Sequence, residues 1–128
     1  MKQILPALFC LLSVHAFSQD SSKTKPKQFL GVLTLTEKFK DEKNWSHQDL
    51  SIVGDHFKRL LKSKTDGILI LAGRTEYEAN NPDMMGLVIF YAKDDTAALQ
   101  FMMEDPAVKN NIMAAKVHPY GVAVNKCD

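Results

Sequence analysis

His56 is the side chain of this sequence best placed to move a proton. It lies at the edge of an apolar stripe that runs at helical spacing from Leu50 to Leu61, so its imidazole is expected to be partly shielded from water. Partial burial can bring the pKa of a histidine into a range useful for proton transfer. Such a histidine needs a carboxylate or a carbonyl to fix its tautomer. The alternative is a boundary histidine that packs its ring and hydrogen-bonds a backbone carbonyl, and the residues alone leave both open.

Three further side chains lie in or after predicted strands and can line a pocket. Arg74 follows a strand end, where loops often build sites, and it can clamp an anionic substrate or form a surface ion pair. His118 alternates with Val117 along a strand, so it faces away from the helices if Val117 faces them. Tyr120 can place a hydroxyl in a cavity, although tyrosine is also an ordinary strand residue. Arg74, His118 and Tyr120 are therefore candidate substrate-binding residues.

The sequence carries no pattern that predicts a metal ion or a cofactor. His47 and His56 are nine residues apart, so on one helix they point to different faces and cannot chelate an ion as an i, i+4 pair would. There is no CxxC pair, HExxH motif, glycine-rich phosphate loop or serine nucleophile elbow. We expect chemistry that requires neither metal nor cofactor.

The composition is that of one globular domain. The chain has 128 residues, with 16 Lys and Arg against 15 Asp and Glu, and a formal net charge of +1. This near balance argues against a nucleic-acid-binding protein, which usually carries a basic excess. Hydrophobic residues make up 45% and charged residues 24%, which excludes wholesale disorder and a polytopic membrane protein. Two cysteines are too few for a disulfide scaffold or a zinc site of four cysteines.

Residues 1–18 are typical of a secretory signal peptide. A basic start is followed by an apolar stretch and by small residues that precede a cut before Gln19. An uncleaved anchor is the alternative, but the apolar stretch is too short to span a bilayer. We therefore expect a secreted or periplasmic protein with no membrane attachment after cleavage. Polar residues 19–28 would form a flexible leader, residues 29–125 the domain, and Cys127 would be the single remaining cysteine.

The domain alternates between strand and helix patterns. Ser46 is a plausible N-cap of the first helix, with Asp49 completing an approximate capping box, and Asp66-Gly67 ends it. A second helix opens at residues 94–96 and ends before the Asp105-Pro106 pair. A short helix is expected within 107–114, and Pro119 favours an edge position for the last strand. The predicted strands are 29–36, 68–72, 86–92 and 115–124.

The order β-α-β-β-α-β predicts an α+β fold of the ferredoxin-like type. Two right-handed crossovers place both helices on one face of a four-stranded antiparallel sheet. The other face is then uncovered, and we expect it to include apolar residues such as Leu33, Leu35, Ile89 and Val122. A large exposed apolar face predicts a partner, and the simplest partner is a second copy packed sheet on sheet as a homodimer.

An ordered set of residues runs from the first predicted strand to the last: residues 29–35, His56 with Leu60 behind it, Asp66-Gly67, Ala72-Gly73, Gly86, Asp105-Pro106 and His118-Pro119-Tyr120. This set resembles the YCII-related family. The departures are Arg74, where the family often has proline, and Tyr120, where tryptophan or phenylalanine is common.

The resemblance implies a dimeric α/β-barrel protein with an active-site histidine and aspartate. The histidine maps onto His56, and the aspartate maps first onto Asp105 and second onto Asp66. Some relatives act as dehydrochlorinases on chlorinated hydroquinones, while most members of the family have no settled reaction.

Two classes of function follow. The first is a small cofactor-free enzyme that acts on an aromatic or carbonyl compound, in which His56 moves a proton and Asp105 orients it. The second is a non-catalytic dimer that binds a small ligand or another protein. A pocket at His56 with a carboxylate in hydrogen-bond reach would favour the enzyme, and a closed, packed ring would exclude it.

Overall fold

The computed structural model describes residues 26–126 of the 128. The predicted signal peptide at 1–18, most of the predicted leader and Cys127 lie outside these residues. No helix within the described range is long and apolar enough to cross a membrane.

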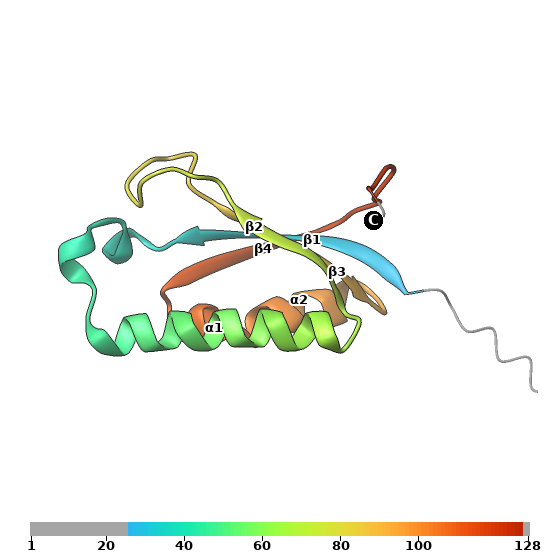
Figure 1. The fold of residues 1–128 in the computed structure, drawn as a ribbon, viewed down its shortest axis with the longest axis horizontal. Helices are drawn as coiled ribbons and strands as arrows, with labels where there is room; N and C mark the ends of the chain where they lie inside the picture. The colour runs from blue at the N-terminus through green and yellow to red at the C-terminus, as the bar shows by residue number, and fades with distance from the viewer. Residues whose placement is uncertain (1–25, 127–128) are drawn as a thin grey trace, which may run out of the picture.

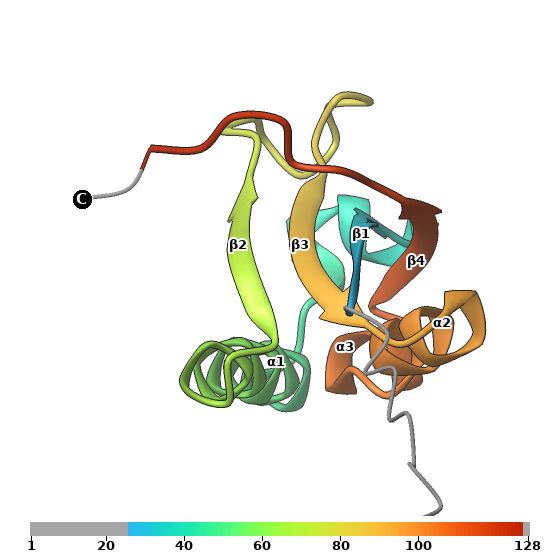
Figure 2. The same ribbon diagram turned by 90° about the vertical axis from the view of Figure 1, so that its right-hand side faces the viewer.

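Four antiparallel strands form one sheet in the order β2-β3-β1-β4, which confirms the predicted ferredoxin-like arrangement. The α-helices all lie on one side of this sheet (Figures 1 and 2). The elements are β1 (Lys27–Leu35), the 3-10 turns η1 (Glu37–Lys40) and η2 (Glu42–Asn44), α1 (His47–Thr65), β2 (Leu69–Arg74), β3 (Gly86–Ala92), α2 (Asp95–Met103), α3 (Pro106–Lys109) and β4 (Met113–Pro119).

The ends of α1 are fixed by the residues that the sequence indicated. The hydroxyl of Ser46 accepts a hydrogen bond from the backbone N–H of Asp49, and the Asp49 carboxylate accepts one from the backbone N–H of Ser46. This reciprocal pair satisfies two of the donors that a helix start leaves free. Gly67 follows the helix with a φ of 75°, a left-handed conformation that glycine adopts without strain.

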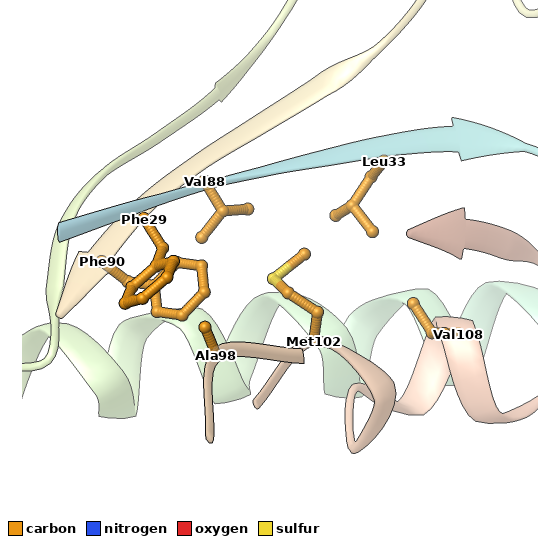
Figure 3. Close-up of a cluster of buried hydrophobic side chains, with 7 residues drawn as sticks. All are labelled: Phe29, Leu33, Val88, Phe90, Ala98, Met102 and Val108. Carbon is orange, nitrogen blue, oxygen red and sulfur yellow. The ribbon is translucent and has the colours of Figure 1, made fainter. Parts of the chain in front are cut away.

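The core lies between the sheet and the helices. Phe29, Val88 and Phe90 point from the sheet toward α2, where they meet Ala98 and Met102 (Figure 3). A Cβ built at Gly31 would lie 2.6 Å from Cε of Met102, so the missing side chain of this glycine lets α2 pack closely against β1. A second buried cluster joins Leu35, Phe39, Ala107 and Ile112 near the start of β4.

The residues on the uncovered face of the sheet differ from those predicted. Leu33 and Leu35 are buried on the helix side, because β1 turns Phe29 and every second residue after it toward the helices. The open face instead carries Leu30 and Val32 of β1, paired with Ile89 and Leu87 of β3.

The chain beyond β4 runs over the open side of the sheet (Figure 2). The predicted contribution of Val122 to the last strand is wrong, since β4 ends at Pro119. The backbone N–H of Val122 instead donates to the side-chain oxygen of Gln28.

Several boundaries also differ from the sequence prediction. The short helix α3 ends at Lys109, because Asn111 takes a φ of 56° and turns the chain into β4 at Met113, two residues earlier than expected. The first strand begins at Lys27 rather than 29, and β2 continues to Arg74 rather than 72. Pro119 is the last residue of β4, which is an edge strand as expected.

Candidate active site

His56 and Asp105 meet between α1 and α3. Nδ1 of His56 lies 2.7 Å from Oδ2 of Asp105, within hydrogen-bond distance. The His56 side chain is 12% exposed and that of Asp105 is 3% exposed, so the contact is almost closed to solvent. The contact that the family resemblance suggested is therefore present, and the competing interpretation of a histidine bonded only to a backbone carbonyl does not describe this ring.

Asp105 is held in place by the local sequence Asp-Pro. It is the N-cap of α3, and its Oδ1 accepts a hydrogen bond of 2.9 Å from the backbone N–H of Ala107. Pro106 occupies the first helical position, where its fixed φ suits the helix and its missing N–H leaves no donor unsatisfied. One carboxylate oxygen is thus used for the cap and the other is directed at His56.

Arg59 supplies a positive group beside the same carboxylate. Its Nη1 lies 3.7 Å from Oδ2 of Asp105, and its Nη2 donates to the backbone oxygen of Phe101 at 2.6 Å. The guanidinium also lies over the Phe101 ring, 4.4 Å from the ring centre. Arg59 is three residues after His56, so both side chains leave the same face of α1.

The surroundings of Asp105 decide its charge. Burial alone would raise the pKa of this carboxyl, but the hydrogen bond and charge of His56, the N–H of Ala107 and the nearby Arg59 hold its pKa below the ordinary value. The carboxylate is therefore ionised at neutral pH and can only accept hydrogen bonds. Nδ1 of His56 must then carry the proton, which leaves Nε2 with a free lone pair in the neutral ring.

His56 lines a cleft between α1 and the sheet. Among the described residues no buried side-chain nitrogen lacks a hydrogen-bond partner, and no protein group bonds Nε2, so this atom keeps contact with solvent. The cleft has a volume of about 360 Å³, and we call it the His56 cleft. Its apolar walls include Leu33, Leu35, Phe57, Leu60, Met84 and Met113.

Arg74 lies at the same cleft. It is the last residue of β2 and lines the cleft together with His56. It is exposed, and it takes part in none of the ion pairs found between residues 26 and 126. The surface ion pair considered as an alternative for Arg74 is therefore absent there, and its guanidinium is available to an anion.

The other two candidate binding residues lie elsewhere. His118 pairs with Leu30 across the sheet and is exposed on the open face, as the alternation with Val117 predicted. Tyr120 lines a separate hollow of about 900 Å³ with Tyr91 and Lys27. Neither His118 nor Tyr120 lines the His56 cleft, and no buried charged side chain lines the hollow at Tyr120.

Asp66 does not reach His56. It caps the C-terminal end of α1, and its carboxylate pairs with Lys62 at 2.5 Å. Ten residues of helix separate it from His56, a rise of about 15 Å. Of the two aspartates that the sequence offered as partners, Asp105 makes the contact.

Several contributors to the site carry no clear sequence signal. Arg59 could have been found from its i, i+3 spacing to His56, which puts both on one helix face. Met84 and Met113 come from a loop and from the start of β4, and no local pattern relates them to α1. Within residues 26–126, no three His, Cys, Asp or Glu side chains come together as metal ligands.

Comparison with known proteins gives one family match. The model of the YCII-related domain matches residues 21–118, which include β1, α1 with His56, Asp105 and most of β4. No curated protein matches the chain.

Proposed function

This chain belongs to the YCII-related family, and we propose that it is an acid–base catalyst that moves a proton on a small aromatic or carbonyl compound. His56 is the catalytic residue, Asp105 is its positioning residue and Arg74 binds an anionic group of the substrate. The observation that carries the proposal is the nearly buried hydrogen bond of 2.7 Å between His56 and Asp105, made by a histidine that lines an apolar cleft.

The proton transfer needs only groups of this chain. Nε2 of His56 takes a proton from an acidic C–H or O–H of the bound compound, and the electron pair of that bond stays on the substrate as an enolate or phenolate. The imidazolium that forms is stabilised by the ionised Asp105, and it later returns the proton to the substrate or to water. Arg74 at the cleft stabilises the developing negative charge.

Deuterium exchange tests the proposal without knowledge of the final product. The chain is incubated in D₂O with a panel of hydroxylated aromatic and β-dicarbonyl compounds, and loss of C–H signals is followed by proton NMR. We expect catalysed exchange for at least one compound. His56→Ala should slow it by about 10²- to 10⁴-fold, the usual contribution of general acid–base catalysis.

His47→Ala is the matched control, because His47 is an exposed histidine at the start of α1 that lines neither the His56 cleft nor its neighbour. It should exchange at the wild-type rate. If His56→Ala exchanges as fast as His47→Ala while both remain folded, the proton-transfer role is excluded. Compounds that bind without exchange in the wild-type chain would support the non-catalytic alternative instead.

We also propose a homodimer formed through the open face of the sheet. The support is the apolar character of that face, where Leu71 is 55% exposed beside Ile89. Analytical ultracentrifugation of the chain should show a dimer, and Leu71→Lys should give a monomer. Leu61→Lys is the control, because Leu61 is equally apolar and 50% exposed but lies on α1. A monomeric wild-type chain would refute this proposal.

Export is proposed from the composition of residues 1–18 alone. Fractionation of the producing cell should find the chain outside the cytoplasm, and mass spectrometry should find a new N-terminus at Gln19. Retention of Met1 in a cytoplasmic fraction would contradict it.

A further inference from the structure

A second hollow adjoins the His56 cleft beside the first half of α1. It has a volume of about 840 Å³ and shares His56, Phe57, Arg74 and Met84 with the His56 cleft. The walls that it does not share come from the residues before α1, from the first turns of that helix and from Ala79 in the loop between β2 and β3. The two spaces therefore adjoin at the residues that they share. We call the second space the Gly54 hollow.

Gly54 is a residue that the fold of this chain does not explain. It lies within the 19-residue helix α1, where glycine costs about 1 kcal/mol relative to alanine. Its φ is not positive, and a Cβ built there would meet nothing within 4 Å. Neither backbone conformation nor packing within residues 26–126 requires a glycine, and the position lines the Gly54 hollow but not the His56 cleft.

Gly54 lies between two large apolar side chains on α1, so the helix surface has a gap at this residue, which we call the notch. Leu50 and Phe57 lie one turn away along the same face of α1, and they are 56% and 60% exposed. Trp45 lines the hollow from the segment before the helix, and its position is fixed by a hydrogen bond of 2.9 Å from Nε1 to the backbone oxygen of Phe39. The hollow is thus lined both by Trp45 and by the apolar side chains of Leu50 and Phe57, between which Gly54 contributes no side chain.

The charges of the two spaces differ. Arg74 lies where the spaces meet and has no ion pair among the described residues, whereas Glu42 lines only the Gly54 hollow. An anionic group is attracted to the junction at Arg74 and repelled by Glu42 beyond it. An uncharged apolar chain suits the notch and the hollow.

We propose that the site takes an elongated monoanion, with its anionic group at Arg74 and an unbranched apolar chain that passes Gly54 into the Gly54 hollow. This inference rests on the proposed function only for the placement of the anionic group. It adds the shape and the single charge of the substrate class.

Straight-chain carboxylates of four to ten carbons are suitable probes, with binding to the whole chain measured by isothermal titration calorimetry. We expect affinity to rise with length by up to about four-fold per buried methylene. In Gly54→Leu the notch is filled, so butanoate should bind within about two-fold of the wild type while the gain with length is lost. Gly54→Ala should show a reduced gain.

Ser51→Leu is the matched control, because it adds the same side chain to an exposed position of α1 that lines neither space. It should keep the wild-type dependence on length. Arg74→Gln should weaken all lengths by the same factor of at least about ten.

The result that overturns the inference is an equal dependence on length in the wild type and in Gly54→Leu, or no dependence in either. The outcome is separate from that of the deuterium exchange experiment. A gain with length that Gly54→Leu removes would uphold the elongated site even if His56 moves no proton, and exchange without a gain would uphold the catalyst alone.

Discussion

Asp49 and Asp105 both stabilise the start of a helix, Asp49 in the first turn of α1 and Asp105 directly before α3. The pKa of each carboxyl is lower than its ordinary value. Hydrogen bonds to Ser46 lower the pKa of Asp49. Burial raises the pKa of Asp105, but His56, Ala107 and Arg59 together lower it by more. The difference is in the second oxygen and in burial. Asp49 uses its carboxylate only on Ser46 at the surface, whereas Asp105 is buried and directs Oδ2 at His56.

This comparison shows how a structural residue can become part of a site. A cap fixes a carboxylate with one oxygen, and burial makes the free oxygen a strong and specific partner. A carboxylate that stabilises a helix start at the surface has no such consequence, because water competes for its second oxygen. The predictions below test this difference.

The largest effect is expected for Asp105→Ala. The variant loses the α3 cap and leaves Arg59 and His56 without their anion, so the free energy of unfolding should fall by about 3–5 kcal/mol. Urea unfolding followed by circular dichroism measures it. A loss no greater than that of Asp49→Ala would show that burial adds nothing to the cap.

Asp105→Asn should cost less than Asp105→Ala, because an amide oxygen can still accept from the N–H of Ala107. The folded-state pKa of Asp105 is lower than that of an aspartate in the unfolded chain, so its ionised form adds stability above the unfolded-state pKa, and this stability is lost as the pH falls through the lower folded-state pKa. Urea unfolding between pH 3 and pH 7 should show the wild-type advantage over Asp105→Asn shrinking at the acid end. An advantage that grows on acidification would contradict the assigned direction.

Ser46→Ala removes the N-cap of α1, to which Asp49 is hydrogen-bonded. We expect a loss of about 1 kcal/mol in the free energy of unfolding, the usual value for an exposed N-cap. Asp49→Ala should be destabilising in the same direction, and the two changes should not be additive because they break the same box. A double variant measured by urea unfolding checks this, and full additivity would mean that the two bonds are independent.

Asp66→Ala is expected to have the smallest effect. Its partner Lys62 is 75% exposed, and a surface ion pair of this kind contributes about 0–1 kcal/mol. Thermal unfolding should place this variant close to the wild type. A loss comparable to that of Asp105→Ala would mean that the site extends to the end of α1.

Much of the fold could be predicted because it depends on local patterns. Ser46 and Gly67 mark the ends of α1 through their own backbone and hydrogen-bond preferences, and the order of elements leads to the sheet topology. The assignment of Leu33 and Leu35 to the open face failed, because the β1 segment is apolar on both faces and its composition does not show which residues face the helices.

The site was less accessible to sequence reasoning. The hydrogen bond between His56 and Asp105 joins residues 49 apart, and only the family resemblance related them. The walls contributed by Met84 and Met113 depend on how a loop and a strand start approach α1 in space. Arg74 was identified from its place after a strand, but its lack of an ion pair could be known only from the structure.

The two outer strands of the sheet, β2 and β4, are the edges at which a strand from another copy of the chain could pair. An unpaired strand edge is a template for aggregation, and proteins protect it with bulges, prolines and charges. The register of β2 with β3 shifts between Leu69 and Leu71, and this outer strand ends at Arg74. On the opposite border β4 ends at Pro119, which offers no N–H to a further strand. A register shift on one border and a proline on the other are features that disfavour the addition of a strand from another copy.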